Sequence, residues 1–157
     1  MRQSMKRYIM HLAEVQRDHC CYCMHRMIVY MPQKGEALPR NAQTKDHFEP
    51  RCHGGPTTSE NLVLACSQCN RLRGDMDAHA FFNLLQKWFK QNPDLQERWH
   101  DADQETLKAI HEHCKRVHES YLRGRGKRSV EHAFRHYEWL HRQWHHQMWL
   151  KMRQAWY

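Results

Sequence analysis

Two Cys-x-x-Cys pairs, far apart along the chain, constrain its fold more than any other sequence feature. The first pair is Cys20 and Cys23, and the second is Cys66 and Cys69. Four thiolates in two such pairs can complete one tetrahedral zinc site, which would bring the two regions together. Residues 24–65 lie between the pairs, a longer segment than a compact zinc ribbon has. The pattern therefore predicts a structural zinc ion that clips this segment into a small domain.

The remaining cysteines leave alternatives open. Seven is an odd number, and four of the seven stand in metal-type spacing, which favours a reducing, cytoplasmic compartment over a disulfide framework. Cys21 can replace Cys20 as a zinc ligand, although the knuckle spacing favours Cys20. Cys52 and His53 can form another metal pair. Cys114 lies on an apolar helical stripe, where a thiol buried in the core is the simpler interpretation.

The charge of the chain narrows the classes of partner. Its 25 Lys and Arg outnumber its 17 Asp and Glu, which gives a formal net charge of +8. This balance favours a polyanionic partner, with nucleic acid first and an anionic membrane surface second. The longest uninterrupted apolar runs, such as residues 27–31, are far too short to span a bilayer, and no signal peptide is recognisable. We therefore expect a nucleic-acid partner and no membrane partner.

The first half of the chain is expected to combine short helices and strands. Apolar residues at helical spacing predict a helix over residues 1–17, capped by Ser4. Short apolar runs predict strands at residues 27–31 and 61–65, and residues 44–48 can form another strand, which Pro50 stops. A short helix is expected from residue 67 to about Gly74, because glycine is a common C-terminal stop.

Beyond this region the periodicity is helical throughout. Three helices are expected: from Asp75 or Asp77 to a break at residues 92–93, from Asp101 or Asp103 onward, and over about residues 130–156. The predicted fold class is α+β. Residues 1–76 form a small zinc-clipped core with an N-terminal helix, and residues 77–157 form a basic, aromatic-rich helical extension.

The predicted zinc clip encloses side chains that suit phosphodiester hydrolysis. His47 can deprotonate water, since imidazole is the side chain best matched to neutral pH. Asp46 and Asn70 offer hard oxygen donors, which suit Mg²⁺ or Mn²⁺ better than zinc. Asn61 can tie down the loop backbone and so orient His47. Arg73, one helical turn beyond Asn70, can hold a phosphate oxygen.

The order of these residues resembles the HNH endonucleases, a family with a ββα-metal fold and a four-cysteine zinc site. The segments that carry the resemblance are Asp46-His47-Phe48-Glu49-Pro50, Gly54-Gly55, Asn61-Leu62 and Cys66-Ser67-Gln68-Cys69-Asn70-Arg71-Leu72-Arg73-Gly74. It implies that His47 is the general base, that Asp46 and Asn70 hold a catalytic divalent cation, and that Asn61 is the orienting residue. Asn70 replaces the His of the family name, a common variant, and Arg73 stands where Lys is usual. The resemblance covers about residues 18–75.

The resemblance implies a metal-dependent endonuclease that hydrolyses DNA phosphodiester bonds, by nicking or by cutting both strands. RNA is an alternative substrate, because it would use the same residues. The alternative from another class is a zinc-stabilised module that binds or recruits nucleic acid without turnover.

Cations are concentrated in the C-terminal region. From residue 121 onward there are eight Lys and Arg against two Glu, which suggests a surface along a phosphate backbone. The turn at residues 123–128 can anchor nucleic acid or act as a linker. For the C-terminal Trp residues, packing in a core or a homodimer is favoured over base stacking. The cations expected to contact nucleic acid are Arg51, Arg71, Arg73, Arg123, Arg125, Lys127 and Arg128.

Overall fold

The computed structural model describes residues 3–123 and residue 153. Five helices and two strands lie within this range. The helices are α1 (Gln3–Val15), α2 (Ser67–Arg73), α3 (Ala78–Gln91), α4 (Pro93–Trp99) and α5 (Gln104–Arg123). The strands are β1 (Gln43–His47) and β2 (Leu62–Cys66), and two short 3₁₀ turns, η1 (Arg51–His53) and η2 (Ser59–Asn61), lie between them. The α+β class predicted from the sequence is confirmed.

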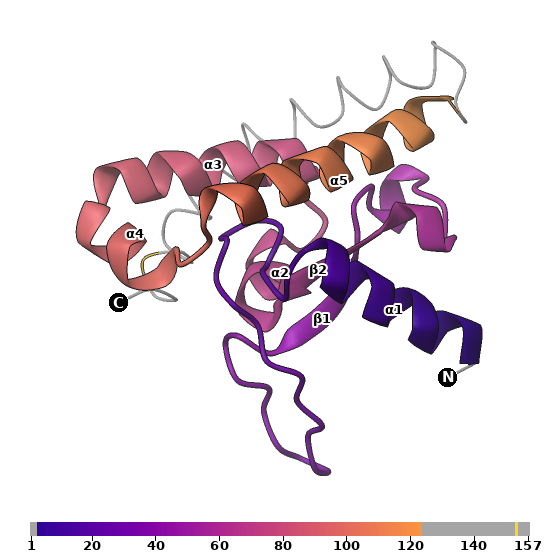
Figure 1. Cartoon of the computed structure of the whole chain (residues 1–157), viewed down its shortest axis with the longest axis horizontal. Helices are drawn as coiled ribbons and strands as arrows, with labels where there is room; N and C mark the ends of the chain where they lie inside the picture. Colours follow the sequence, from indigo (N-terminus) through magenta and orange to yellow (C-terminus); the bar gives the residue numbers. More distant parts are fainter. Residues whose placement is uncertain (1–2, 124–152, 154–157) are drawn as a thin grey trace.

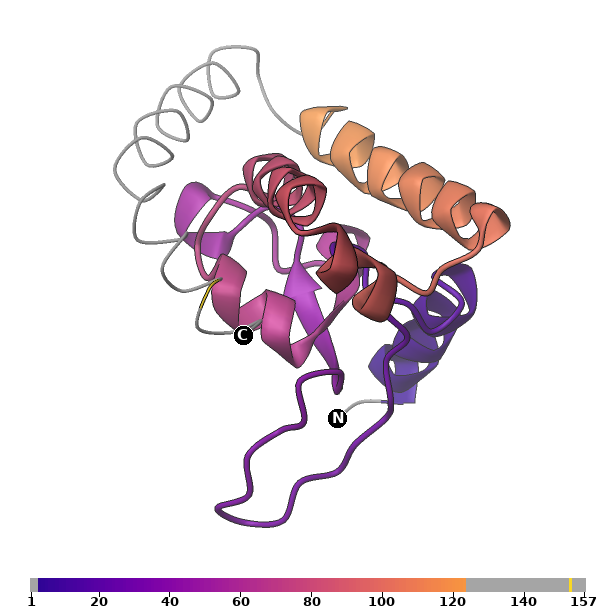
Figure 2. The same cartoon turned by 90° about the vertical axis from the view of Figure 1, so that its left-hand side faces the viewer.

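The two strands form an antiparallel pair that carries the core of the molecule. The register runs from Gln43 opposite Cys66 to His47 opposite Leu62. All five residues of β2 are buried, so this apolar strand is covered on both faces. Helices α1 and α2 lie on either side of the pair (Figures 1 and 2). Because α2 follows β2 without a linker, the second Cys pair spans the strand-to-helix junction.

The helices after residue 76 pack against the same core. Phe81 of α3 meets Tyr22 edge to face, with ring centroids 5.2 Å apart. One cluster of buried side chains includes residues of α1, β2, α3 and α5. Figure 1 shows α3 and α5 running along one side of the strand pair. The division of the chain at residue 76 therefore stays a prediction, since the packing is continuous across it.

Several predicted helix boundaries agree with the structure, and two do not. Asp77 caps α3 by accepting a hydrogen bond from the Ala80 backbone at 3.0 Å, as expected. Asp103 accepts from the Thr106 backbone at 2.7 Å at the start of α5. The prediction that Ser4 caps the first helix is wrong, because Ser4 lies within α1. Helix α4 was not expected, although Pro93 at its first turn is a favourable start because proline lacks the donor that this turn leaves unused.

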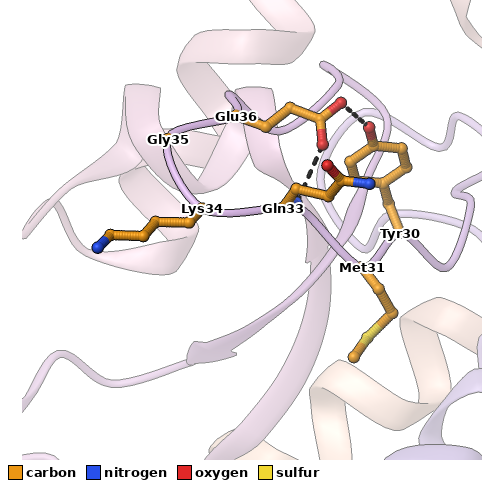
Figure 3. A pocket seen from close by; sticks show the side chains of 6 residues that line it. All are labelled: Tyr30, Met31, Gln33, Lys34, Gly35 and Glu36. Carbon is orange, nitrogen blue, oxygen red and sulfur yellow. Dashed lines mark hydrogen bonds between the residues drawn. The ribbon is translucent and has the colours of Figure 1, made fainter.

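The strand predicted at residues 27–31 is absent from the described part of the chain. Ile28 forms only an isolated bridge with Ala42, and the chain then leaves the body as a loop (Figure 1). Residues 27–31 have a high strand propensity, but no strand of the described residues pairs with them along their length. At the loop tip, the Glu36 carboxylate accepts hydrogen bonds from the Tyr30 hydroxyl and from the Gln33 backbone (Figure 3).

Part of the sequence-based reasoning falls outside the described residues. The helix expected over about residues 130–156, with its part in a possible homodimer, and residues Arg125, Lys127 and Arg128 belong to this part. Of Arg123, the structure describes the backbone at the end of α5. Within the described residues, no helix is both long enough and apolar enough to cross a membrane.

Candidate metal and nuclease site

The four cysteines of the two pairs converge on one point. Their sulfur atoms lie within 4.8 Å of one another, and all four residues are fully buried. The sulfurs of Cys23 and Cys66 are 3.8 Å apart. A tetrahedral zinc ion with Zn–S bonds of about 2.3 Å separates its ligands by about 3.8 Å, so the cluster fits this ion. Backbone N–H groups also point at the sulfurs, from Tyr22 to Cys20 at 3.4 Å and from Cys69 to Cys66 at 3.3 Å.

The alternatives for the remaining cysteines can be compared with this geometry. Cys20, not Cys21, belongs to the cluster, and burial raises the pKa of the Cys21 thiol. Cys52 is exposed, and the ring of its neighbour His53 contacts the Asp75 carbonyl oxygen at 2.9 Å. Among the described residues, no metal cluster that includes Cys52 and His53 is formed.

Asp46 lies in β1 with its side chain turned inward. The Tyr22 hydroxyl donates a hydrogen bond to Asp46 Oδ2 at 3.0 Å, and Arg73 Nη1 donates to the same oxygen at 2.6 Å. Burial raises the pKa of Tyr22 well above its ordinary value, so this hydroxyl keeps its proton and acts as the donor. Both hydrogen bonds use Oδ2, which leaves Oδ1 as the oxygen available to another ligand.

Asn70 lies against the same face of β1 as Asp46. Thr44 and Asp46 are two residues apart in the strand, so their side chains project to the same side. The Asn70 amide nitrogen donates to Thr44 Oγ1 at 2.9 Å and to the Lys45 carbonyl oxygen at 3.2 Å. Because the amide nitrogen donates to the strand in this way, the side-chain oxygen is the Asn70 atom that could act as a metal ligand. The first turn of α2 thus carries an amide oxygen to the carboxylate side of β1.

His47 is the last residue of β1 and is partly buried. Alternation along the strand directs it to the face opposite Asp46, and the chain bends directly after it, at Phe48 and Glu49. Burial lowers the pKa of the imidazole below its ordinary value, against the opposing charge of Asp46. The neutral imidazole is therefore the form present at neutral pH.

Asn61 fixes the loop that follows His47. Its side chain accepts from the Glu49 backbone N–H at 2.9 Å and donates to the Glu49 and Pro56 carbonyl oxygens, each at 2.9 Å. Gly55 is required in this loop, since a Cβ atom there would lie 1.9 Å from the Glu49 carbonyl oxygen. The loop backbone is thus tied to the start of β2, which is the contact expected of Asn61.

The structure corrects the role predicted for Arg73. Its side chain is 1% exposed, and its guanidinium donates to Asp46, to the His47 and Phe48 carbonyl oxygens at 2.7 Å each, and to the Met76 carbonyl oxygen at 2.8 Å. A guanidinium whose nitrogens are directed to protein acceptors in the interior does not reach a phosphate, so the predicted phosphate contact is wrong. Burial opposes the charged form of Arg73, but the charge of the Asp46 carboxylate and its hydrogen bond favour that form, and the pKa of Arg73 is raised.

The sequence did not indicate that Tyr22 binds Asp46. Tyr22 belongs to the turn at residues 20–23, which we call the zinc knuckle. Tyr22 lies between the two knuckle cysteines, and no pattern in the sequence connects it with Asp46, 24 residues away. Of the three core cations expected to contact nucleic acid, Arg51 and Arg71 are exposed and Arg73 is buried.

The fold and the sulfur cluster define a small α+β metal-binding domain in which a strand pair is followed directly by a short helix. Residues 20–76, a little over a third of the chain, match the family model of the HNH endonucleases. The match includes both cysteine pairs and every core residue discussed above, and it confirms the resemblance seen in the sequence. No curated protein and no solved structure matches the chain. The family indicates a nucleic-acid-related, nuclease-type function.

Proposed function

We propose that this protein is a metal-dependent endonuclease that hydrolyses phosphodiester bonds in DNA. The observation that carries the proposal is the placement of Asp46 and Asn70 on one side of β1, within the stretch that matches the HNH endonuclease family. Carboxylate and amide oxygens are the donors that Mg²⁺ and Mn²⁺ prefer. A divalent cation bound there would stabilise the negative charge of the phosphate and of the leaving oxygen.

A protein side chain, rather than the metal ion, would remove the proton from the attacking water. His47, neutral at neutral pH, would accept the proton of the attacking water at a ring nitrogen. Asn61 holds the loop that begins immediately after His47 and so limits the movement of the imidazole. The four-cysteine cluster would hold zinc as a structural ion, since four thiolates leave no open position for a substrate.

Exposed cations beside the site support a polyanionic substrate. Arg51 follows the loop bend after β1, and Arg71 lies on α2 between Asn70 and Arg73. We assign phosphate contacts to these two residues in the core. The net charge of +8 acts in the same direction over a longer range, because it attracts a polyanion before contact.

A second candidate function, a nucleic-acid-binding module without turnover, has one observation in its favour. Arg73 already pairs with Asp46 at 2.6 Å, and this cation neutralises the carboxylate that would hold the metal ion. If that pair excluded a divalent cation, the domain would keep its zinc-stabilised fold and its basic surface but would not cleave.

Cleavage of supercoiled plasmid in Mg²⁺ or Mn²⁺ tests the proposal. We expect the wild-type protein to nick or linearise the plasmid and the His47→Ala variant to be slower by about 10²- to 10⁴-fold, the usual loss for a general base. The control is His11→Ala, which removes an exposed imidazole from α1 and should leave the rate unchanged. An RNA substrate in parallel reactions establishes which nucleic acid is cut. Equal binding with no cleavage by wild type and His47→Ala alike would refute the endonuclease and support the binding module.

A further inference from the structure

We propose that Tyr22 is a positioning residue that couples the four-cysteine cluster to the catalytic cation. Its hydroxyl holds Asp46 Oδ2, so that the carboxylate presents Oδ1 to the ion. The inference rests on the proposed function, because it assigns a role at the same site. It adds a residue that touches neither substrate nor metal ion and acts through Asp46.

The position of Tyr22 is set by the zinc knuckle. The residue lies between Cys20 and Cys23, and both of these cysteines belong to the sulfur cluster. The residue is 2% exposed, and its ring packs edge to face against that of Phe81, with centroids 5.2 Å apart. A side chain fixed at its backbone by two metal ligands and at its ring by a buried aromatic residue has little freedom to move. Its hydroxyl oxygen is therefore a rigid reference point inside the domain.

Two donors on one oxygen fix the orientation of the Asp46 carboxylate. Tyr22 approaches Oδ2 from the knuckle at 3.0 Å, and Arg73 approaches the same oxygen from α2 at 2.6 Å. The Arg73 nitrogen that binds Asp46 also donates to the His47 carbonyl oxygen, so its direction is constrained by the backbone. With donors from two different elements, rotation of the carboxylate breaks at least one hydrogen bond. The knuckle thereby determines where Oδ1 lies.

Without Tyr22, Arg73 would be the side chain that determines the position of the Asp46 carboxylate. A guanidinium that donates to a carboxylate attracts it toward itself and competes with an incoming divalent cation. The neutral Tyr22 hydroxyl orients the carboxylate without adding a second positive charge beside it. It therefore opposes movement of the carboxylate toward Arg73 and keeps the free oxygen in place.

The test uses Tyr22→Phe, which removes the hydroxyl and keeps the ring that packs on Phe81. Binding of Mn²⁺ to the zinc-loaded full-length protein is measured from the electron paramagnetic resonance signal of free Mn²⁺. We expect the Mn²⁺ dissociation constant to rise about 10-fold or more, since loss of an outer hydrogen-bond partner of a metal ligand commonly has this effect. We also expect kcat for plasmid nicking to fall while KM for DNA stays constant. Zinc content should equal that of the wild type.

The matched control is Tyr30→Phe. Tyr30 also donates its hydroxyl to a carboxylate, that of Glu36, but it does so in the projecting loop (Figure 3). The same chemical change there should alter neither Mn²⁺ affinity nor zinc content. A general effect of removing a tyrosine–carboxylate hydrogen bond is excluded by this comparison.

The outcomes separate the inference from the proposed function. Unchanged or tighter Mn²⁺ binding by Tyr22→Phe would overturn the positioning role, and so would loss of zinc, which would assign Tyr22 to the fold of the knuckle. If the wild type bound Mn²⁺ and Tyr22→Phe bound it more weakly, but neither cleaved nucleic acid, the inference would stand and the endonuclease proposal would fail. Absence of Mn²⁺ binding by the wild type would overturn both.

Discussion

The hydrogen bonds of Arg73 depend on the geometry of a guanidinium. Its Nε, Nη1 and Nη2 atoms donate in different directions, to Met76, to Asp46 and His47, and to Phe48. The single ammonium group of a lysine cannot reach acceptors spread in this way. The departure from the usual Lys at this position therefore has a structural reason: the residue joins the end of α2 to the end of β1.

Replacement of Arg73 is expected to destabilise the fold. Arg73→Ala would leave the buried Asp46 carboxylate without its ionic partner, which typically costs about 3–5 kcal/mol. Arg73→Lys should fall between Ala and wild type, because it keeps the charge but loses hydrogen bonds. Urea unfolding measures both. The control is Arg71→Ala on the same helix, where an exposed side chain should contribute within about 0.5 kcal/mol. Equal stability of the Arg71 and Arg73 variants would show that the buried pair is dispensable.

Much of the residue-level site was beyond sequence reasoning. Asp46, His47 and Asn70 could be selected because each stands at a fixed position in a motif. The pairing of Asp46 with Arg73 could not, since the two are 27 residues apart and charged side chains are normally expected at the surface. Tyr22 was missed for the same reason, as its role arises only when the knuckle folds against β1.

At the scale of elements, α2 combines two functions in seven residues. Its first turn carries the zinc-cluster residue Cys69 and the candidate cation ligand Asn70 side by side, and its last residue is the buried Arg73. The junction of β2 and α2 was predictable almost to the residue, because the second Cys pair and Gly74 delimit it. The strand at residues 27–31 was not, since strand propensity does not reveal whether a partner strand is present.

The two proposed metal sites should respond differently to mutation. Cys66→Ser should abolish zinc binding and cooperative unfolding, because zinc binding supplies on the order of 10 kcal/mol of folding free energy in finger-like units. Asn70→Ala should keep the zinc, lose about 1–2 kcal/mol of stability with its two hydrogen bonds, and abolish cleavage. Zinc content, thermal unfolding and plasmid nicking are measured on both variants. Identical behaviour of the two would contradict the separation of a structural from a catalytic metal ion.

At the scale of the whole molecule, α5 contacts the loop that follows β1. His118 Nδ1 lies 3.7 Å from Glu49 Oε1, and the ring of His79 on α3 is 4.5 Å from that of His118. The Glu49 carboxylate raises the pKa of His118 against the effect of burial, and Asp77 and Glu119 act in the same direction. This contact connects the helical extension to the loop next to His47.

The His118–Glu49 pair should make stability depend on pH. Since the pKa of His118 is raised in the folded state, the pair stabilises fully below the unfolded pKa of about 6.5 and is lost as pH rises through the folded value. His118→Gln should therefore destabilise the protein more at about pH 5.5 than at about pH 8.5. Denaturant unfolding at both pH values measures this difference. His111→Gln, an exposed position on the same helix, should show no such dependence. A His118→Gln effect that is equal at the two pH values would argue against the pair.

The edge-to-face packing of Phe81 on Tyr22 bears on whether the stretch that matches the family model can fold independently. That stretch ends at residue 76, yet the aromatic ring that closes over its knuckle comes from the next helix. Part of the core of this stretch is thus formed by a residue of α3, outside the matched region. In a fragment cut at residue 76, the Tyr22 ring would be exposed to water where Phe81 covers it in the intact protein. We therefore expect such a fragment to be less stable than the full chain.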